Sequence, residues 1–220
     1  PFLRPSTVRD ASLMTSWRFL QFMLSYKQEK DAIIQWAEQH ADNPAVAILS
    51  NKNIDKLPSM TAFITASPKF GIWSPIASVG LIKQWFSVTS NDINVNLNKP
   101  MMIASLNNSF TLPKGFLVTL DANYQGIGST QNVELTKDKY VVNLGVTKSF
   151  LNDKLSVTLK GHDIFHGEKT GITAYNNKLH ISQDNIWDTR EFEITVRYKF
   201  NTNGSRYKGT GAGQNEFNRL

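Results

Sequence analysis

The sequence contains no cysteine, which excludes disulfide-stabilised scaffolds, cysteine-ligated zinc and thiol catalysis. No run of about 18 apolar residues occurs, so a transmembrane helix is not expected. Glycine is too sparse for a collagen-like chain, at 13 of 220 residues. Charged residues are also scarce, at 19%, whereas aromatic residues reach 11%. This balance argues against a disordered chain and favours a folded one.

Signals of chemistry are equally scarce. No GxSxG element occurs, and the glycines of Gly209–Gly213 have no βαβ context that would make them a phosphate loop. Glu191 and Glu193 lie two apart on one strand face, where Arg197 and Lys199 balance their charge, so a glycosidase pair is not expected. His162 and His166 fall where a strand meets a loop, so a zinc site is not expected. We therefore expect neither an enzyme nor a metal or other cofactor.

The charge pattern argues against nucleic acid as a partner. The formal net charge is +6, but the lysines and arginines are scattered and form no basic stripe interleaved with aromatic residues. The chain begins at Pro1 without a basic and apolar leader. A cytosolic protein and a truncated chain remain open at this point, and the strand pattern below favours truncation.

Alternation with a period of two is the strongest pattern in the sequence. In Glu191–Phe200 the apolar and aromatic residues take every second position, and charged residues or threonine take the positions between. Because successive side chains of a strand point to opposite faces, this segment has one apolar and one polar face. Helical periodicity is almost absent, and its best candidate is the short segment Lys30–Ala41.

About nine strands follow from this pattern. The others are expected near Ala11–Trp17, Leu20–Lys27, Met60–Pro68, Ile76–Thr89, Met101–Leu112, Phe116–Gln125, Tyr140–Thr147 and Leu155–His162. The phase slips at Leu81 and Ile82, which predicts a β-bulge. Many strands exceed the five or six residues usual in soluble sheets, and they match the thickness of a bilayer when tilted.

Short and long connections alternate along the chain. Short turns are expected at Arg18–Leu20, Phe70–Pro75, Pro113–Gly115 and Leu151–Lys154, and long polar loops at Ala37–Leu57, Ser90–Lys99, Ile127–Lys139 and Ile164–Asn185. This rhythm is typical of an outer-membrane β-barrel with periplasmic turns and external loops. A soluble β-sandwich remains the alternative, because alternation alone does not say whether the apolar face meets lipid or a second sheet.

Two elements carry a resemblance to a known family. The C-terminal segment, which ends in RYKGTGAGQNEFNRL (residues 206–220), resembles the end of Bacteroidetes outer-membrane barrels of the TonB-dependent receptor superfamily. Gly161–Phe165 is similar to the "NDIF" strand end of that family, with His162 in place of Asn. Pro1–Pro5 resembles the family's "NPxLkP" entry to a strand. With the strands between, the resemblance covers essentially the whole chain.

The resemblance implies an all-β, antiparallel transmembrane barrel portion of up-and-down strands, a fragment of a barrel of about 22 strands. Residues 1–200 would form the C-terminal part of the barrel, and residues 201–220 a periplasmic tail. The location would be the cell outer membrane and the activity the import of a large nutrient such as a glycan, peptide or metal chelate. Implied partners are outer-membrane lipids, a TonB-type energy-transducing complex and a surface lipoprotein. A non-transporting adhesin or assembly scaffold is the alternative.

Polar residues of the lumen and outer loops are the expected solute contacts, because recognition of polar solutes needs converging hydrogen-bonding groups. Asp121, Asn123 and Gln125 lie near the outer end of one strand. The long loop at Ile164–Asn185 offers further hydrogen-bonding and stacking groups, namely Tyr175, Asn176 and His180.

Overall fold

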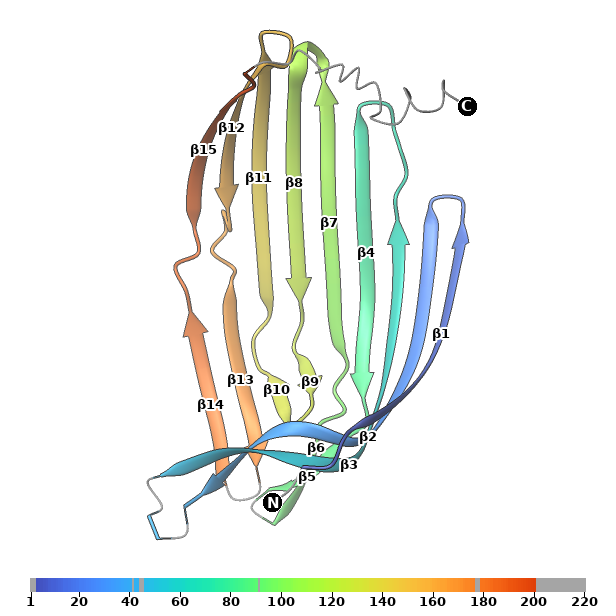
Figure 1. Ribbon diagram of the computed structural model, residues 1–220, viewed down its shortest axis with the longest axis vertical. Coiled ribbons are helices and arrows are strands. Elements are labelled where there is room, and N and C mark those ends of the chain that lie inside the picture. Colours follow the sequence, from blue (N-terminus) through green and yellow to red (C-terminus); the bar gives the residue numbers. More distant parts are fainter. Residues whose placement is uncertain (1–2, 41, 44–45, 91, 177–178, 201–220) are drawn as a thin grey trace, which may run out of the picture.

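The computed structural model describes residues 3–40, 42–43, 46–90, 92–176 and 179–200, and the expected tail at 201–220 lies outside them. One sheet of nine antiparallel strands dominates the fold, in the order β1-β2-β3-β4-β7-β8-β11-β12-β15 (Figure 1). Its strands are β1 (Thr7–Trp17), β2 (Leu20–Gln39), β3 (Ala47–Ala66), β4 (Trp73–Gln84), β7 (Met101–Leu112), β8 (Phe116–Gln125), β11 (Lys139–Phe150), β12 (Leu155–His162) and β15 (Glu191–Tyr198). Each strand pairs with its neighbours in chain order, as the sequence predicted. Among the described residues the sheet does not close into a barrel.

Two smaller sheets stand at one end of the large one. The first has the order β14-β13-β10-β9, and the second is the pair β5-β6. Their strands are β5 (Ser87–Ser90), β6 (Ile93–Asn96), β9 (Gly128–Thr130), β10 (Val133–Leu135), β13 (Lys169–Asn176) and β14 (Leu179–Ile186). Strand β5 falls almost wholly in the expected strand Ile76–Thr89, which the structure ends at Gln84 instead. The other five lie in three of the segments expected to be long loops, apart from Ile186 at the end of β14. The expectation of plain loops was therefore wrong there, although the short turns at the other end are confirmed.

The fourth expected loop, Ala37–Leu57, is mostly strand. Strands β2 and β3 run for 20 residues each and form one long hairpin, whose far half crosses the end of the sheet toward β14 (Figure 1). We call this half, Ala32–Gln39 with Ala47–Ile54, the arch. The helical candidate Lys30–Ala41 was wrong, because its residues through Gln39 belong to β2. Ala32, Ile34 and Trp36 alternate with a strand period and are buried.

The arch begins at a kink. Asp31 has a φ of 54°, a left-handed conformation that Asp tolerates better than most residues. The Asn53 side chain donates to the carbonyls of Arg4 and Asp31 at 2.9 and 2.8 Å, and the Arg4 guanidinium pairs with the Asp31 carboxylate at 2.6 Å. These contacts fix the bend, while the pairing register remains the same from Leu20↔Ala66 to Gln39↔Ala47.

The large sheet has one apolar and one polar face. Phe192, Ile194 and Val196 pair with Gly161, Leu159 and Val157, whereas Glu193 and Arg197 pair with Lys160 and Ser156. Tyr140, Val142 and Leu144 likewise pair with Tyr124, Ala122 and Leu120, so the expected division of faces is confirmed for these strands. Exceptions occur on β2, β3 and β7, where the apolar residues Met23, Phe63 and Ile103 lie on the polar face. The bulge expected at Leu81 and Ile82 is wrong, because both residues continue the regular pairing with Ala62 and Thr61. Ile82 is an apolar residue on the polar face.

A protein-lined core exists beneath the arch. Ala32, Ile34 and Trp36 pack there with Leu57, Phe86, Val88 and Leu97. On the large sheet, by contrast, many apolar side chains are exposed, among them Phe192 at 77% and Ile194 at 71%. Among the described residues no helix is long and apolar enough to cross a membrane.

Candidate functional site

A polar cavity of about 570 Å³ lies on the polar face of β8, β11, β12 and β15. Its lining is Leu117, Thr119, Asp121, Thr147, Ser156, Thr158, Lys160, Glu193, Thr195 and Arg197. These residues lie together because the strand period places every second residue of each strand on this wall. Because these residues are mostly hydroxyl-bearing or charged, the wall offers many hydrogen-bonding groups at close spacing.

Threonines form a row across the middle of the cavity. Thr147 pairs with Thr158 on β12, and Thr158 pairs with Thr195 on β15. The hydroxyls of Thr147 and Thr158 are 2.9 Å apart. A hydroxyl both donates and accepts, so the row can meet a solute hydroxyl or amide of either polarity.

Charged groups flank the threonine row. Lys160 and Glu193 are directly opposite each other in the register, and Arg197 lies opposite Ser156. The Glu193 carboxylate accepts a hydrogen bond from Thr195 and lies 3.7 Å from His162 Nε2. Within the described part of the chain, Arg197 has no ion pair. The cavity thus presents both cationic and anionic groups beside the threonine row.

Of the six predicted contacts, Asp121 lines this cavity. Asn123 and Gln125 share its strand and face, farther from the short-turn end. The Gln125 amide donates to Met101 Sδ at 3.3 Å. These three lie on β8, while the other three lie on the β13–β14 hairpin, so the structure does not gather the six into one site. Their role in solute binding stays a prediction.

Tyr175 and His180 belong to the assembly around the arch. Their rings meet edge to face with centroids 5.1 Å apart, and His180 Nε2 lies 2.7 Å from the Ser90 hydroxyl. The Tyr175 hydroxyl donates to Glu134 at 3.4 Å. Burial, together with the neighbouring Glu134 carboxylate, raises the pKa of Tyr175. Both side chains thus link the β13–β14 hairpin to β5 and β10.

Asn176 completes a clasp on the arch. Its side-chain oxygen accepts from the Ala37 N–H at 3.1 Å and from Asn132 Nδ2 at 2.9 Å. Asn132 Nδ2 also lies 3.2 Å from the carbonyl of Gln35. Strand β1 pairs with β2 only up to Lys30, so the two asparagines bind the edge of β2 where β1 no longer covers it. We call Asn132 and Asn176 the asparagine clasp.

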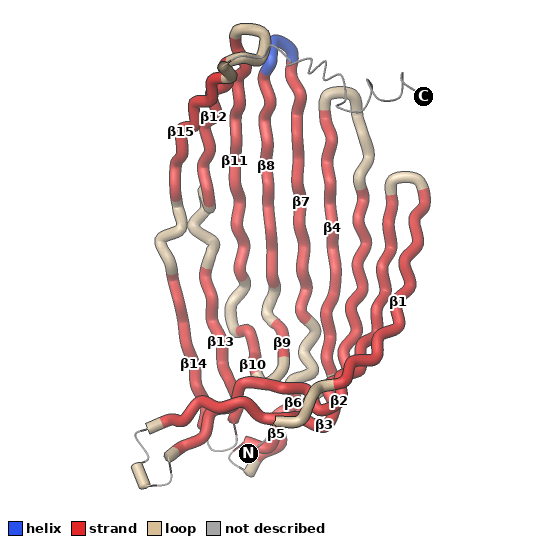
Figure 2. The backbone as a smooth tube through the Cα atoms, in the orientation of Figure 1, coloured by secondary structure: helices blue, strands red, loops and turns tan. Residues whose placement is uncertain are grey.

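Asp163 organises a second junction, in the segment similar to the "NDIF" motif. Figure 2 shows loops at the same level between β12 and β13 and between β14 and β15. Asp163 joins them, because its buried carboxylate accepts from the Thr189 hydroxyl at 2.5 Å and from the N–H groups of Gly167 and Glu168 at 2.8 and 3.2 Å. Burial raises the pKa of Asp163, but these hydrogen bonds, with a contribution from His166, outweigh it and hold that pKa below its ordinary value.

Sequence reasoning did not single out Lys160, Arg197 and the threonine row as a site, nor Asn132 as a structural residue. The alternating pattern of the sequence could have identified Lys160, Arg197 and the threonines, because it places them on one face of their strands. Pairing each strand with its neighbour in the chain would then have aligned them. Asn132 gave no signal, because one asparagine in a polar segment is indistinguishable from its solvated neighbours.

Comparison with known proteins gives one family match. A family model described as "Outer membrane protein beta-barrel family" matches residues 1–198. No curated protein matches the chain, and no solved structure does.

Proposed function

Because this chain belongs to the outer membrane protein beta-barrel family and is therefore a barrel protein of the outer membrane, we propose that it forms the C-terminal part of the wall of a TonB-dependent receptor. Such a receptor imports a large polar nutrient, and the polar face of the large sheet would line its lumen. The glycan, peptide and metal-chelate classes remain the candidate nutrients. The resemblance of the C-terminal segment and of Gly161–Phe165 supports the superfamily.

The observation that carries the import proposal is the polar cavity. Its row of threonine hydroxyls, with Asp121 on one side and Lys160, Glu193 and Arg197 on the other, presents donors and acceptors to the space that a solute would cross. The arch and the hairpins β5–β6, β9–β10 and β13–β14, which we call the external hairpins, stand at one end of the same wall (Figure 1). This is the outer end when the short turns face the periplasm. A passing solute would therefore meet the hairpins first and the cavity afterwards.

A barrel larger than the described sheet follows from the edges. In the described residues β1 and β15 each pair on one side only, and an unpaired edge in lipid leaves N–H and C=O groups without partners at high cost. We propose that further strands pair with both edges and close a barrel of about 22 strands. A TonB-type complex and a surface lipoprotein are the proposed partners for energy and capture.

The test is uptake by cells carrying Thr158→Val together with Arg197→Ala. We expect slower uptake of the nutrient, because two groups of the cavity lose their hydrogen-bonding capacity. Val157→Ala, on the apolar face of the same strand, is the matched control, and heat-modifiable gel mobility reports folding of each variant. Unchanged uptake by a folded double variant would contradict import through this wall and favour the adhesin or scaffold alternative. Shortening Ile164–Asn185 is a poorer test, because it removes Asn176 from the clasp.

A further inference from the structure

The apolar face carries a groove of about 480 Å³ over β1 to β4. Two adjacent rows of side chains border it, and Met23, Phe63 and Gly80, which lie between these rows along the strands, complete its lining. Leu13, Leu24, Ala62 and Leu81 are aligned by the register in one row. Thr15, Phe22, Ile64 and Val79 are aligned in the other.

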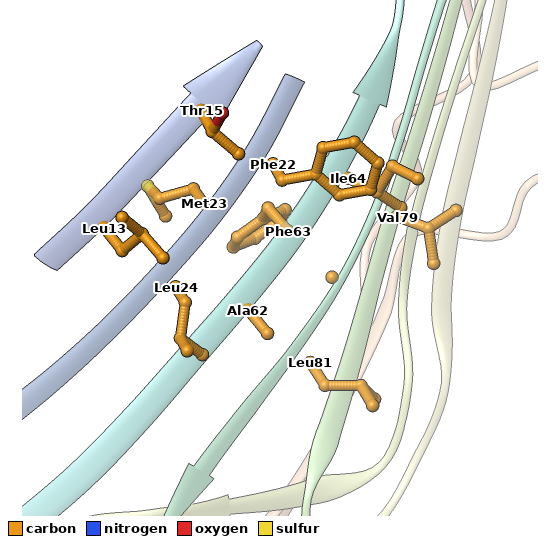
Figure 3. Close-up of a pocket in the computed structure, with 11 residues that line it drawn as sticks. Leu13, Thr15, Phe22, Met23, Leu24, Ala62, Phe63, Ile64, Val79 and Leu81 are labelled. Atoms are coloured by element: carbon orange, nitrogen blue, oxygen red, sulfur yellow. The ribbon is translucent and has the colours of Figure 1, made fainter. Parts of the chain in front are cut away.

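The hollow has a local cause. Ala62 is the smallest side chain of its row and lies between Leu24 and Leu81 (Figure 3). Its leucine neighbours and the next row, with Phe22 and Ile64, stand higher around it, and all four of these larger side chains are exposed. A flexible hydrocarbon chain fits a depression of this kind, because its methylene groups can follow the side chains that border it.

A cation stands at the end of the same strands. Arg18 lies in the tight turn between β1 and β2, and its guanidinium is 5.0 Å from the centre of the Trp17 ring. The turn is one of the short ones, which face the periplasm in outer-membrane barrels. Leu13 lies four residues before Trp17, roughly 14 Å along the strand and about 11 Å in depth when the strand is tilted by about 40°. Because the apolar band of such barrels is about 25 Å tall, the groove falls in the half nearer the periplasm.

We propose that this groove binds one acyl chain of a phospholipid of the periplasmic leaflet, and that Arg18 pairs with the anionic headgroup of that lipid. The occupant follows from the surroundings. The family places the chain in the outer membrane, the groove lies on the apolar face, and the tryptophan–arginine pair has the chemistry of a headgroup contact. The inference depends on family membership and not on nutrient import.

The experiment is native mass spectrometry of the intact protein in detergent, titrated separately with phosphatidylglycerol and phosphatidylethanolamine. We expect one retained lipid and about a fivefold preference for phosphatidylglycerol, the size expected of one cation near an anionic headgroup. Arg18→Gln should remove the preference without removing the lipid. Lys154→Gln, an exposed cation in another short turn, is the matched control and should keep the preference.

Filling the hollow tests the acyl chain. Ala62→Phe should abolish the retained lipid, whereas Ala122→Phe, on the same face but outside the groove, should retain it. Equal retention of both lipids by the wild type, or full retention by a folded Ala62→Phe variant, would overturn the proposal. A dimer that Ala62→Phe dissolves would also overturn it, because a second copy would then be the occupant. The Arg18→Gln measurement decides the headgroup contact even if Ala62→Phe does not fold.

Discussion

Asn176→Ala should loosen the arch while leaving the large sheet intact. Asn176 is 2% exposed and its oxygen accepts two hydrogen bonds, from the Ala37 N–H and from Asn132. A buried donor that loses its acceptor costs about 1–3 kcal/mol. Asn132 keeps the Gln35 and Tyr175 carbonyls as partners, so most of the loss comes from Ala37. We expect the closed arch to lose about 2–3 kcal/mol, which corresponds to roughly 30- to 150-fold more frequent opening.

The assay is hydrogen–deuterium exchange followed on peptides that cover 32–39 and 47–54. Both should exchange faster in Asn176→Ala, while peptides from β8 and β11 keep the wild-type rate. Ser182→Ala is the matched control in the same hairpin, because its exposed hydroxyl lies 3.0 Å from the Thr173 hydroxyl and, among the described residues, contacts neither asparagine of the clasp. Wild-type exchange in the arch of a folded Asn176→Ala variant would refute the reasoning and would mean that the apolar core alone holds the arch closed.

Three further predictions concern the sheet and its outer junction. Val196→Arg should lower the free energy of unfolding in lipid vesicles by about 2–4 kcal/mol if it lies near the midplane, and Thr195→Arg on the polar face should cost far less; equal losses in denaturant titrations would contradict the face assignment. Asp163→Asn should destabilise the protein by about 1–3 kcal/mol at pH 7. Because the pKa of Asp163 is lowered in the folded state, that contribution is present above the ordinary Asp pKa of about 3.9 and lost as the pH falls through the folded value, so the two proteins should converge in acid. Gly80→Ala should slow folding into detergent micelles and destabilise the sheet, because its Cβ would lie 2.3 Å from the Phe63 ring; adding Phe63→Leu should restore much of the loss, and no restoration would count against that contact.

The large sheet could be predicted from the sequence because each of its strands must meet the same physical requirement. Segments such as Glu191–Tyr198 must separate apolar from polar side chains over their whole length, and this leaves a long alternating pattern. The short turns were equally visible, since they leave few residues between two such patterns. The order of strands then followed from chain neighbours pairing in an up-and-down sheet.

The external hairpins could not be read in the same way. Strands β9 and β10 have three residues each, too few for a period to emerge, and partners distant in the chain hold them in place. The prediction for the arch was wrong for a different reason. Ala32, Ile34 and Trp36 have the spacing of a strand, but Ala37, directly after Trp36, is also apolar and buried. Two adjacent apolar residues interrupt the alternation, and the segment therefore resembled a short helix. The asparagine clasp rests on side-chain amides whose partners lie 97 and 139 residues away in the chain.

The kink at Asp31 affects how this hairpin tolerates insertions and deletions. Even-numbered residues of β2 lie on the apolar face before the kink, as Phe22 and Leu24 do, and even-numbered Ala32 and Ile34 enter the core under the arch after it. Both environments therefore depend on one count along the strand. If one residue between Leu20 and Lys30 were deleted while the arch kept its place, the residues of β2 before the deletion would move to the opposite face of the sheet. Gaining or losing two residues together would preserve both, so viable length variants of this hairpin should differ in steps of two.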